Sequence, residues 1–332
     1  MSHAPSPTTP IPVTILTGFL GAGKTTLLNR ILSDPEGVRY GVLVNDFGAV
    51  NIDAALVVER TENSVSLENG CVCCSIRDDL AEAILSILDV DNPPDRLIIE
   101  ASGVSRPLPI ADTLEVESLA ARTALDGVFC LVDAGAFAGL DFADTELAID
   151  QAAGSDLVIL NKVDLATGAE LSAIEESLGA ALPRLRLVHA EKGDIPRALL
   201  LGAHVPGEDR ADAAAAHHGH SHHHDHDHGH DHDHDHADAF QSWSWVRSAA
   251  IDPLKLRAAV RGLPTTLLRA KGVLRAADGT RVVFQLVGKR WSITREDGPA
   301  PAESALVAIG RRGSFDPAAL EALFEEIVAD AA

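Results

Sequence analysis

A glycine-rich stretch near the start of the chain has residue types and spacing suited to phosphate chemistry. Residues 18–26 read Gly-Phe-Leu-Gly-Ala-Gly-Lys-Thr-Thr, which fits the pattern G-x-x-x-x-G-K-T between an apolar run and a helical pattern. In such a loop, backbone N–H groups surround a phosphate, and the dipole of the following helix favours the anion. Lys24 is expected to reach the β- and γ-phosphates, and Thr25 to offer its hydroxyl to Mg²⁺. The predicted phosphate contacts are Gly18, Gly21, Ala22, Gly23, Lys24, Thr25 and Thr26.

A second group of polar residues predicts which base the nucleotide carries. Residues 161–164 read Asn-Lys-Val-Asp and directly follow an apolar run. In a protein with a phosphate-binding loop upstream, this pattern is typical of guanine recognition. Asp164 would accept hydrogen bonds from guanine N1–H and the 2-amino group, a pair that adenine cannot supply. Asn161 is expected at the acceptor edge of the base and the Lys162 stem against its ring, so the sequence predicts GTP.

Two acidic residues follow apolar runs and are candidates for holding the magnesium ion. Residues 97–103 read Leu-Ile-Ile-Glu-Ala-Ser-Gly, so Glu100 comes at the end of the predicted strand 96–99, and the Gly103 N–H is expected to contact a γ-phosphate. Asp46 follows another run in the same way. Either Asp46 or Glu100 should bind Mg²⁺ directly or through water, and the sequence does not decide between them. Lys24, Thr25 and Glu100 are the predicted catalytic residues.

Three thiols within four residues predict a transition-metal site. Cys71, Cys73 and Cys74 follow Glu68-Asn-Gly, and thiolates suit Zn²⁺ or Cu⁺. Three sulfurs leave one tetrahedral position open, which suits a site that passes its ion on. Water, Asp46, Glu68 or a partner's side chain could fill that position. The fourth cysteine of the chain, Cys130, lies within an apolar run and is expected in the core.

A histidine-rich tract adds a second kind of metal chemistry. Twelve histidines fall between His217 and His236, and in the second half of this tract they alternate with aspartate, with one glycine in place of an aspartate. Neutral imidazoles at many equivalent places would collect Zn²⁺, Ni²⁺ or Co²⁺ loosely. The alternative is a solvated linker, and the composition favours the metal collector.

The elements that would position these residues form an α/β pattern followed by a second region. Short β-branched runs alternate with helical patterns, which predicts βαβ units and a mostly parallel sheet. The predicted strands are 11–17, 40–45, 96–99, 127–132, 156–160 and 185–188, and the helices lie near 24–33, 78–88, 145–153 and 168–178. The predicted division is a flexible tail at 1–10, a P-loop domain at 11–205, a His/Asp-rich disordered linker at 206–238 and a small α+β domain at 239–332.

The second region shows strand patterns and two helix starts of the same kind. Asp252 and Asp316 are each followed by proline at the first helical position, which predicts helices at Pro253–Arg261 and Pro317–Ala329. Asp278-Gly279 predicts a hairpin turn. The expected strands begin at Gln241, Thr265, Arg281 and Lys289.

The composition excludes several classes of partner. The chain has 27 basic and 49 acidic residues and a formal net charge of −22, which disfavours nucleic acid and anionic membranes. No apolar run approaches the roughly 18–20 residues that span a bilayer. Residues 1–10 lack the features of a signal peptide. Closely spaced cysteines indicate a reducing, cytoplasmic location.

Taken in order, these motifs resemble the CobW-like GTPases, a metallochaperone family of P-loop proteins. The match rests on residues 18–26, 68–74, 100–103 and 161–164, together with Arg269-Ala-Lys-Gly and Gly288-Lys-Arg-Trp. The resemblance implies a GTPase domain whose Cys-x-Cys-Cys site binds zinc or another transition metal, with hydrolysis coupled to delivery. Two positions depart from the family: this chain has Ala49 where a glutamate is common, and Asp46 where a longer acid is common.

The resulting prediction is a GTP-hydrolysing metallochaperone that binds Zn²⁺ and delivers it to client metalloproteins. The alternatives are a Co²⁺ insertion GTPase for cofactor or enzyme maturation and a GTP-gated metal buffer. A small-molecule kinase is disfavoured by residues 161–164. The sequence leaves the identity of the client and the oligomeric state open, a homodimer included.

Overall fold

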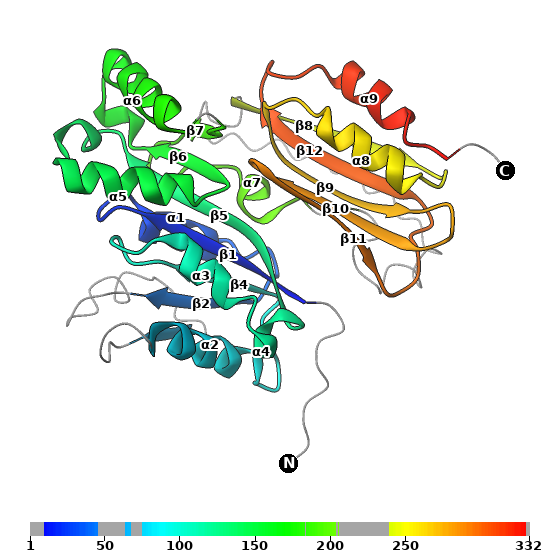
Figure 1. The fold of residues 1–332 in the computed structure, drawn as a ribbon, viewed down its shortest axis with the longest axis horizontal. Helices are drawn as coiled ribbons and strands as arrows, with labels where there is room; N and C mark the ends of the chain where they lie inside the picture. Colours follow the sequence, from blue (N-terminus) through cyan, green and yellow to red (C-terminus); the bar gives the residue numbers. More distant parts are fainter. Residues whose placement is uncertain are drawn as a thin grey trace, which may run out of the picture. The chain divides into compact units, whose positions relative to one another are not determined.

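The computed structural model describes residues 10–45, 64–67, 75–182, 184–203, 205 and 239–329. The chain divides into two compact units, Met1–Ile195 and Pro196–Ala332 (Figure 1). Within the described residues, no helix is both long and apolar enough to cross a membrane.

The first unit is built on a parallel sheet, as the alternating pattern predicted. Its strand order is β3-β2-β4-β1-β5-β6-β7, and each pair of neighbours runs parallel. Strands β1, β4, β5 and β6 carry mainly buried apolar residues, as strands covered on both faces should. The bounds are β1 (Ile11–Gly18), β2 (Tyr40–Asn45), β3 (Ser64–Leu67), β4 (Arg96–Glu100), β5 (Thr123–Asp133), β6 (Leu157–Asn161) and β7 (Leu187–His189).

Helices cover both faces of this sheet. Figure 1 shows α3 and α5 passing in front of β1 and α1 behind it. One apolar cluster joins α2, α3 and α4 to β1 and β4, and another joins α5 and α6 to β5 and β6. The bounds are α1 (Lys24–Ser33), α2 (Ser75–Leu88), α3 (Pro107–Thr113), α4 (Glu117–Ala120), α5 (Phe142–Ala153) and α6 (Gly168–Ala181), with short 3₁₀ turns η2 (Phe137–Gly139) and η3 (Val163–Leu165).

The register of the central strands brings the predicted motifs to one edge. β1 lies between β4 and β5, with Leu16 opposite Glu100 and Gly18 opposite Leu131. β5 and β6 end together, with Asp133 opposite Asn161. The phosphate-binding loop, the Glu100 segment and the Asn161 segment therefore all leave the carboxyl edge of the sheet, where α/β proteins bind their ligands.

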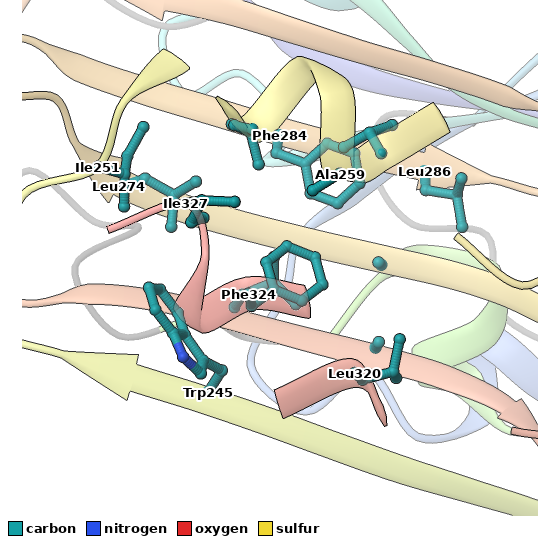
Figure 2. Close-up of a cluster of buried hydrophobic side chains, with 14 of the residues drawn as sticks. Trp245, Ile251, Ala259, Leu274, Phe284, Leu286, Leu320, Phe324 and Ile327 are labelled. Atoms are coloured by element: carbon teal, nitrogen blue, oxygen red, sulfur yellow. The ribbon is translucent and has the colours of Figure 1, made fainter. Parts of the chain in front are cut away.

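The second unit is an antiparallel sheet covered on one face by two helices. The strand order is β11-β10-β9-β12-β8. Trp245 and Phe324 pack in the core between this sheet and the helices (Figure 2). The bounds are β8 (Phe240–Arg247), α8 (Pro253–Arg261), β9 (Leu267–Arg275), β10 (Arg281–Val287), β11 (Arg290–Glu296), β12 (Ser304–Arg311) and α9 (Pro317–Glu325).

Both predicted helix starts in this unit are confirmed, and one predicted end is wrong. The Asp252 carboxylate accepts from the N–H groups of Leu254 and Lys255, and the Asp316 carboxylate accepts from Ala318 N. Helix α9 ends at Glu325 rather than at Ala329. Beyond it, the Ala329 N–H donates to the Ala250 carbonyl, so the chain leaves the helix to pair with another segment.

The short segment before the histidine-rich tract belongs to the second unit. Helix α7 (Arg197–Leu201) presents its last carbonyls to Arg269 on β9, whose Nη1 donates to Leu200 O at 2.9 Å and Leu199 O at 3.3 Å. Val205 packs with Val273 and Ala305 of the same sheet. The sequence analysis grouped this segment with the first domain. The tract at 206–238 lies outside the described residues.

Candidate functional site

The phosphate-binding loop has a backbone that only glycine adopts easily at several positions. Gly18, Gly21 and Gly23 have φ angles of 131°, 74° and 102°. A Cβ at Gly18 would lie 2.1 Å from the Leu131 carbonyl oxygen of β5. The close approach of the loop to β5 therefore requires glycine there, in agreement with the motif.

Lys24 comes at the end of the phosphate-binding loop, and its side chain folds back into the loop. Its side chain is buried, with 6% exposed, and Nζ donates to Gly18 O at 2.9 Å and to Phe19 O at 3.2 Å. Lys24 is also the first residue of α1, so its ammonium group lies close to the N–H groups of the helix start. This arrangement concentrates positive charge where a phosphate would bind.

Two predicted site residues from distant parts of the chain are in direct contact. The Thr25 hydroxyl donates to Glu100 Oε1 at 2.7 Å, and Glu100 is only 2% exposed. A hydroxyl and a carboxylate oxygen beside a phosphate site are hard ligands of the kind that Mg²⁺ prefers. The pair therefore fits a magnesium ion. The other candidate, Asp46, lies outside the described residues.

Gly103 lies against the phosphate-binding loop. It is buried, and a Cβ at this position would approach Leu20 within 2.6 Å of Cγ and 2.7 Å of the backbone N. The segment that follows Glu100 is thus packed on the loop itself. A movement of this segment would therefore displace the phosphate-binding loop, and the reverse also holds.

At the end of the site where the guanine base is expected, Asn161 connects two loops by hydrogen bonds. Its side chain is 1% exposed; Nδ2 donates to Ala22 O at 2.9 Å, and Oδ1 accepts from Gly193 N at 2.9 Å. These contacts connect the phosphate-binding loop with the segment after β7. Sequence reasoning missed Gly193, although Ala190-Glu-Lys-Gly follows a predicted strand on the same edge.

Lys162 and Asp164 belong to the same turn, but Lys162 forms an ion pair and Asp164 is exposed. Lys162 has a left-handed φ of 59°, and its Nζ pairs with Asp133 Oδ2 at 2.7 Å. The Asp164 carboxylate is on an exposed residue of η3. Asp133, which the sequence analysis did not single out, directly follows the predicted strand at 127–132 and is the last residue of β5. It pairs with the ammonium group of Lys162, whereas Asp164 is exposed.

The cysteines divide between one described residue and three others. Cys130 is fully buried on β5, which confirms the predicted core position. Burial raises the pKa of its thiol to about 12, and the nearby charge of Lys24 opposes that shift only in part. Cys71, Cys73 and Cys74 lie outside the described residues. In the parts of the chain that the structure describes, no group of three or more His, Cys, Asp or Glu residues could hold a metal ion.

Several known proteins are similar to this chain. It is 31% identical over 236 residues to the zinc chaperone CobW of Sinorhizobium sp, covering 63% of this chain and 67% of that protein. It is 40% identical over 200 residues to the zinc chaperone YjiA of Escherichia coli K12, covering 59% and 62%. It is 34% identical over 223 residues to the zinc-regulated GTPase metalloprotein activator 1 of Dictyostelium discoideum, covering 56% and 47%. The chain thus matches less than two thirds of the length of two of these relatives.

Family models match both units. The CobW/HypB/UreG nucleotide-binding domain matches residues 12–189, which is more than half of the chain. The cobalamin synthesis protein cobW C-terminal domain matches residues 240–328. Together with the loop, strand and base-end geometry described above, these matches confirm the predicted resemblance: the chain belongs to the CobW/HypB/UreG family of P-loop GTPases.

Proposed function

We propose that this protein is a GTP-hydrolysing metallochaperone that binds Zn²⁺ and delivers it to client metalloproteins. The observation that carries the nucleotide part is the contact between Thr25 and the buried Glu100 carboxylate beside the phosphate-binding loop. The names of the similar proteins support zinc as the cargo and metalloproteins as the clients. A reducing cytoplasm would keep the thiols available.

The residues at the carboxyl edge of the sheet are suited to stabilising the charge on a phosphoryl group during its transfer. Mg²⁺ held by Thr25 and Glu100 would neutralise charge on the β- and γ-phosphate oxygens. The Lys24 ammonium, now held by the Gly18 and Phe19 carbonyls, would exchange these for phosphate oxygens. Asp164 would select guanine, because its exposed carboxylate matches the donor pair of that base.

The zinc part of the proposal rests on Cys71, Cys73 and Cys74. Their thiolates would bind Zn²⁺ as cargo, with one coordination position left for exchange. GTP hydrolysis would then release the segments that contact the γ-phosphate and loosen the ion. Co²⁺ remains an alternative cargo, and the histidine-rich tract favours a buffering role as the second candidate function.

Glu100→Gln tests the magnesium assignment. The amide keeps an acceptor for the Thr25 hydroxyl but removes the charge, so we expect kcat for GTP to fall by about 10²–10³ and the Mg²⁺ concentration for half-maximal activity to rise. Steady-state hydrolysis is measured against Mg²⁺ concentration, with GTP and with ATP. An unchanged Mg²⁺ requirement would reject Glu100 as a magnesium residue. Equal turnover of ATP and GTP by the unmutated protein would reject the guanine assignment.

The transfer step is tested with the cargo itself. Protein loaded with one Zn²⁺ is mixed with an acceptor, the metal-free form of a zinc enzyme of the carbonic anhydrase type. Recovery of the acceptor's activity is followed with GTP, with GDP and without nucleotide. Faster recovery with GTP is expected for a chaperone. Equal recovery in all three conditions would favour the metal buffer.

A further inference from the structure

A buried glutamine on α5 holds the segment that follows Glu100. Gln151 is 0% exposed, and its Nε2 donates to Gly103 O and to Ser105 O, each at 3.0 Å. Carbonyl oxygens only accept hydrogen bonds, so the orientation of the amide is fixed by its partners. One side chain therefore fixes two peptide groups of the segment that leaves the end of β4.

The glutamine is attached to a rigid part of the molecule. Asp141 caps the start of α5 by accepting from Asp144 N, and Ala148 and Ala152 pack in the core on β5 and β6. Just after the helix, Asp156 bonds the backbone of β5 through Val128. The helix is thus the anchor, and the segment is the part that is positioned.

The segment itself has little regular structure of its own. Between β4 and α3, Ala101 N donates to Leu16 O, and Ser105 N donates to Ser102 O in a turn. Gly103 is pressed against Leu20 of the phosphate-binding loop on one side. The two bonds from Gln151 hold it from α5. Because carbonyl and N–H point in opposite directions across a trans peptide, fixing the Gly103 carbonyl also aims the next N–H away from α5.

The amide oxygen of this side chain argues against a role as core filler. Gln151 Oε1 is buried and has no hydrogen-bond partner among the described residues. An unpaired buried acceptor costs free energy, which an apolar side chain of the same size would avoid. What glutamine adds at this place is the pair of N–H donors.

We propose that Gln151 is a positioning residue for GTP hydrolysis: it holds residues 103–105 against the phosphate-binding loop, where their backbone can contact the γ-phosphate. The inference rests on the GTPase function proposed above and extends it to α5. The residue does not touch the nucleotide. It acts through the two carbonyls that it binds.

Gln151→Met is the direct test, because methionine keeps the length and volume but has no donor. In the full-length protein, we expect kcat for GTP to fall about tenfold, and the affinity for a non-hydrolysable GTP analogue to fall by a similar factor. Affinity for GDP, which has no γ-phosphate, should stay within about twofold. Hydrogen exchange of the peptide covering 101–107 should become faster in the analogue-bound state.

The neighbouring Asp150 provides a matched control. Its carboxylate pairs with Arg106 at 2.7 Å on the solvent side of the same segment. Because exposed ion pairs contribute little, Asp150→Asn should leave kcat and both affinities within about twofold. A thermal unfolding transition is recorded for each variant, and Gln151→Leu replaces the methionine variant if that one does not fold.

The outcomes separate this inference from the proposed function. If the unmutated protein hydrolyses GTP and Gln151→Met matches it in kcat and in the GTP-analogue-to-GDP affinity ratio, the positioning role is overturned. If GDP and analogue affinities fall together, the glutamine is merely structural and the inference also fails. Absence of GTP turnover in the unmutated protein would instead reject the proposed function.

Discussion

At the scale of single residues, Asn161 and Asp164 occupy the same short motif but differ in what surrounds them. Asn161 is buried and makes hydrogen bonds with Ala22 and Gly193, whereas Asp164 is exposed. The two residues should therefore respond differently to substitution. One should affect the assembly of the site, and the other should affect the choice of base.

Asn161→Ala is expected to weaken GTP and GDP alike and to lower the free energy of unfolding by about 1–3 kcal/mol. The substitution leaves the Ala22 carbonyl and the Gly193 N–H without their buried partner. Denaturant unfolding and nucleotide titration measure the two effects. Asp164→Asn is the control: stability should be unchanged, while affinity shifts from GTP towards xanthosine triphosphate, whose 2-oxo group matches an amide donor. An unchanged free energy of unfolding for Asn161→Ala would show that the hydrogen bonds of Asn161 with Ala22 and Gly193 do not stabilise the fold.

Much of the site at this scale was predictable, because short motifs fix the chemistry of Lys24, Thr25 and Glu100. The contact between Thr25 and Glu100 was not, since 75 residues separate them and only the strand register brings them together. Asp133 and Gly193 were missed for the same reason. Neither belongs to a motif, and each acquires its role from a partner on another strand.

At the scale of elements, the apolar runs predicted the strands of the first unit because fully buried parallel strands are nearly continuous in hydrophobic residues. β3 was missed: residues 64–67 read Ser-Val-Ser-Leu, which is only half apolar and lies at the sheet edge. In the second unit, the start of α9 was set locally by Asp316 and Pro317. Its end depended on pairing with Ala250, a distant segment that local sequence does not reveal.

The strand β5 contains a titratable group with a measurable effect on stability. Burial raises the pKa of Cys130 to about 12, whereas an unfolded thiol titrates near its usual value of 9.0. Above pH 9 the unfolded chain releases this proton and the folded chain keeps it, so stability falls as pH rises towards 12. The contribution approaches about 1.4 kcal/mol per pH unit.

Cys130→Ala isolates that contribution. Denaturant unfolding between pH 8 and pH 10.5 should show a steeper loss of stability in the unmutated protein than in the variant, since the remaining titratable groups are common to both. Parallel curves would mean that the thiol is not buried in solution. The variant will be less stable at neutral pH, so the slopes are compared rather than the values.

At the scale of the whole molecule, the central expectation is that metal and nucleotide help each other to bind. By linkage, Zn²⁺ must tighten GTP by the same factor as GTP tightens Zn²⁺, and a coupling of about 1–3 kcal/mol is typical. Zn²⁺ is titrated against a competing chelator with GDP and with a non-hydrolysable GTP analogue plus Mg²⁺. Binding should release protons and strengthen with pH, because thiols must ionise.

Cys73→Ala and Cys74→Ala serve as the controls for this coupling, and both should abolish it while leaving GDP affinity intact. A variant that deletes 217–236 should lose weakly bound ions only. If the unmutated protein holds Zn²⁺ equally well in both nucleotide states, it would be a metal-binding GTPase without a transfer mechanism.

The position of Val205 shows which parts of the chain the histidine-rich tract connects. Val205 packs on Val273 and Ala305, and β8 begins at Phe240 in the same sheet, so the chain leaves the second unit and returns to it. The tract is then an excursion from one body, while the covalent link between the two bodies is at Ile195 and Pro196. Loop-closure entropy depends only weakly on loop length: doubling or halving the length changes it by only about 0.6 kcal/mol. Histidines can therefore be gained or lost there almost freely, without lengthening or shortening the connection through which the GTPase unit and the second unit are joined.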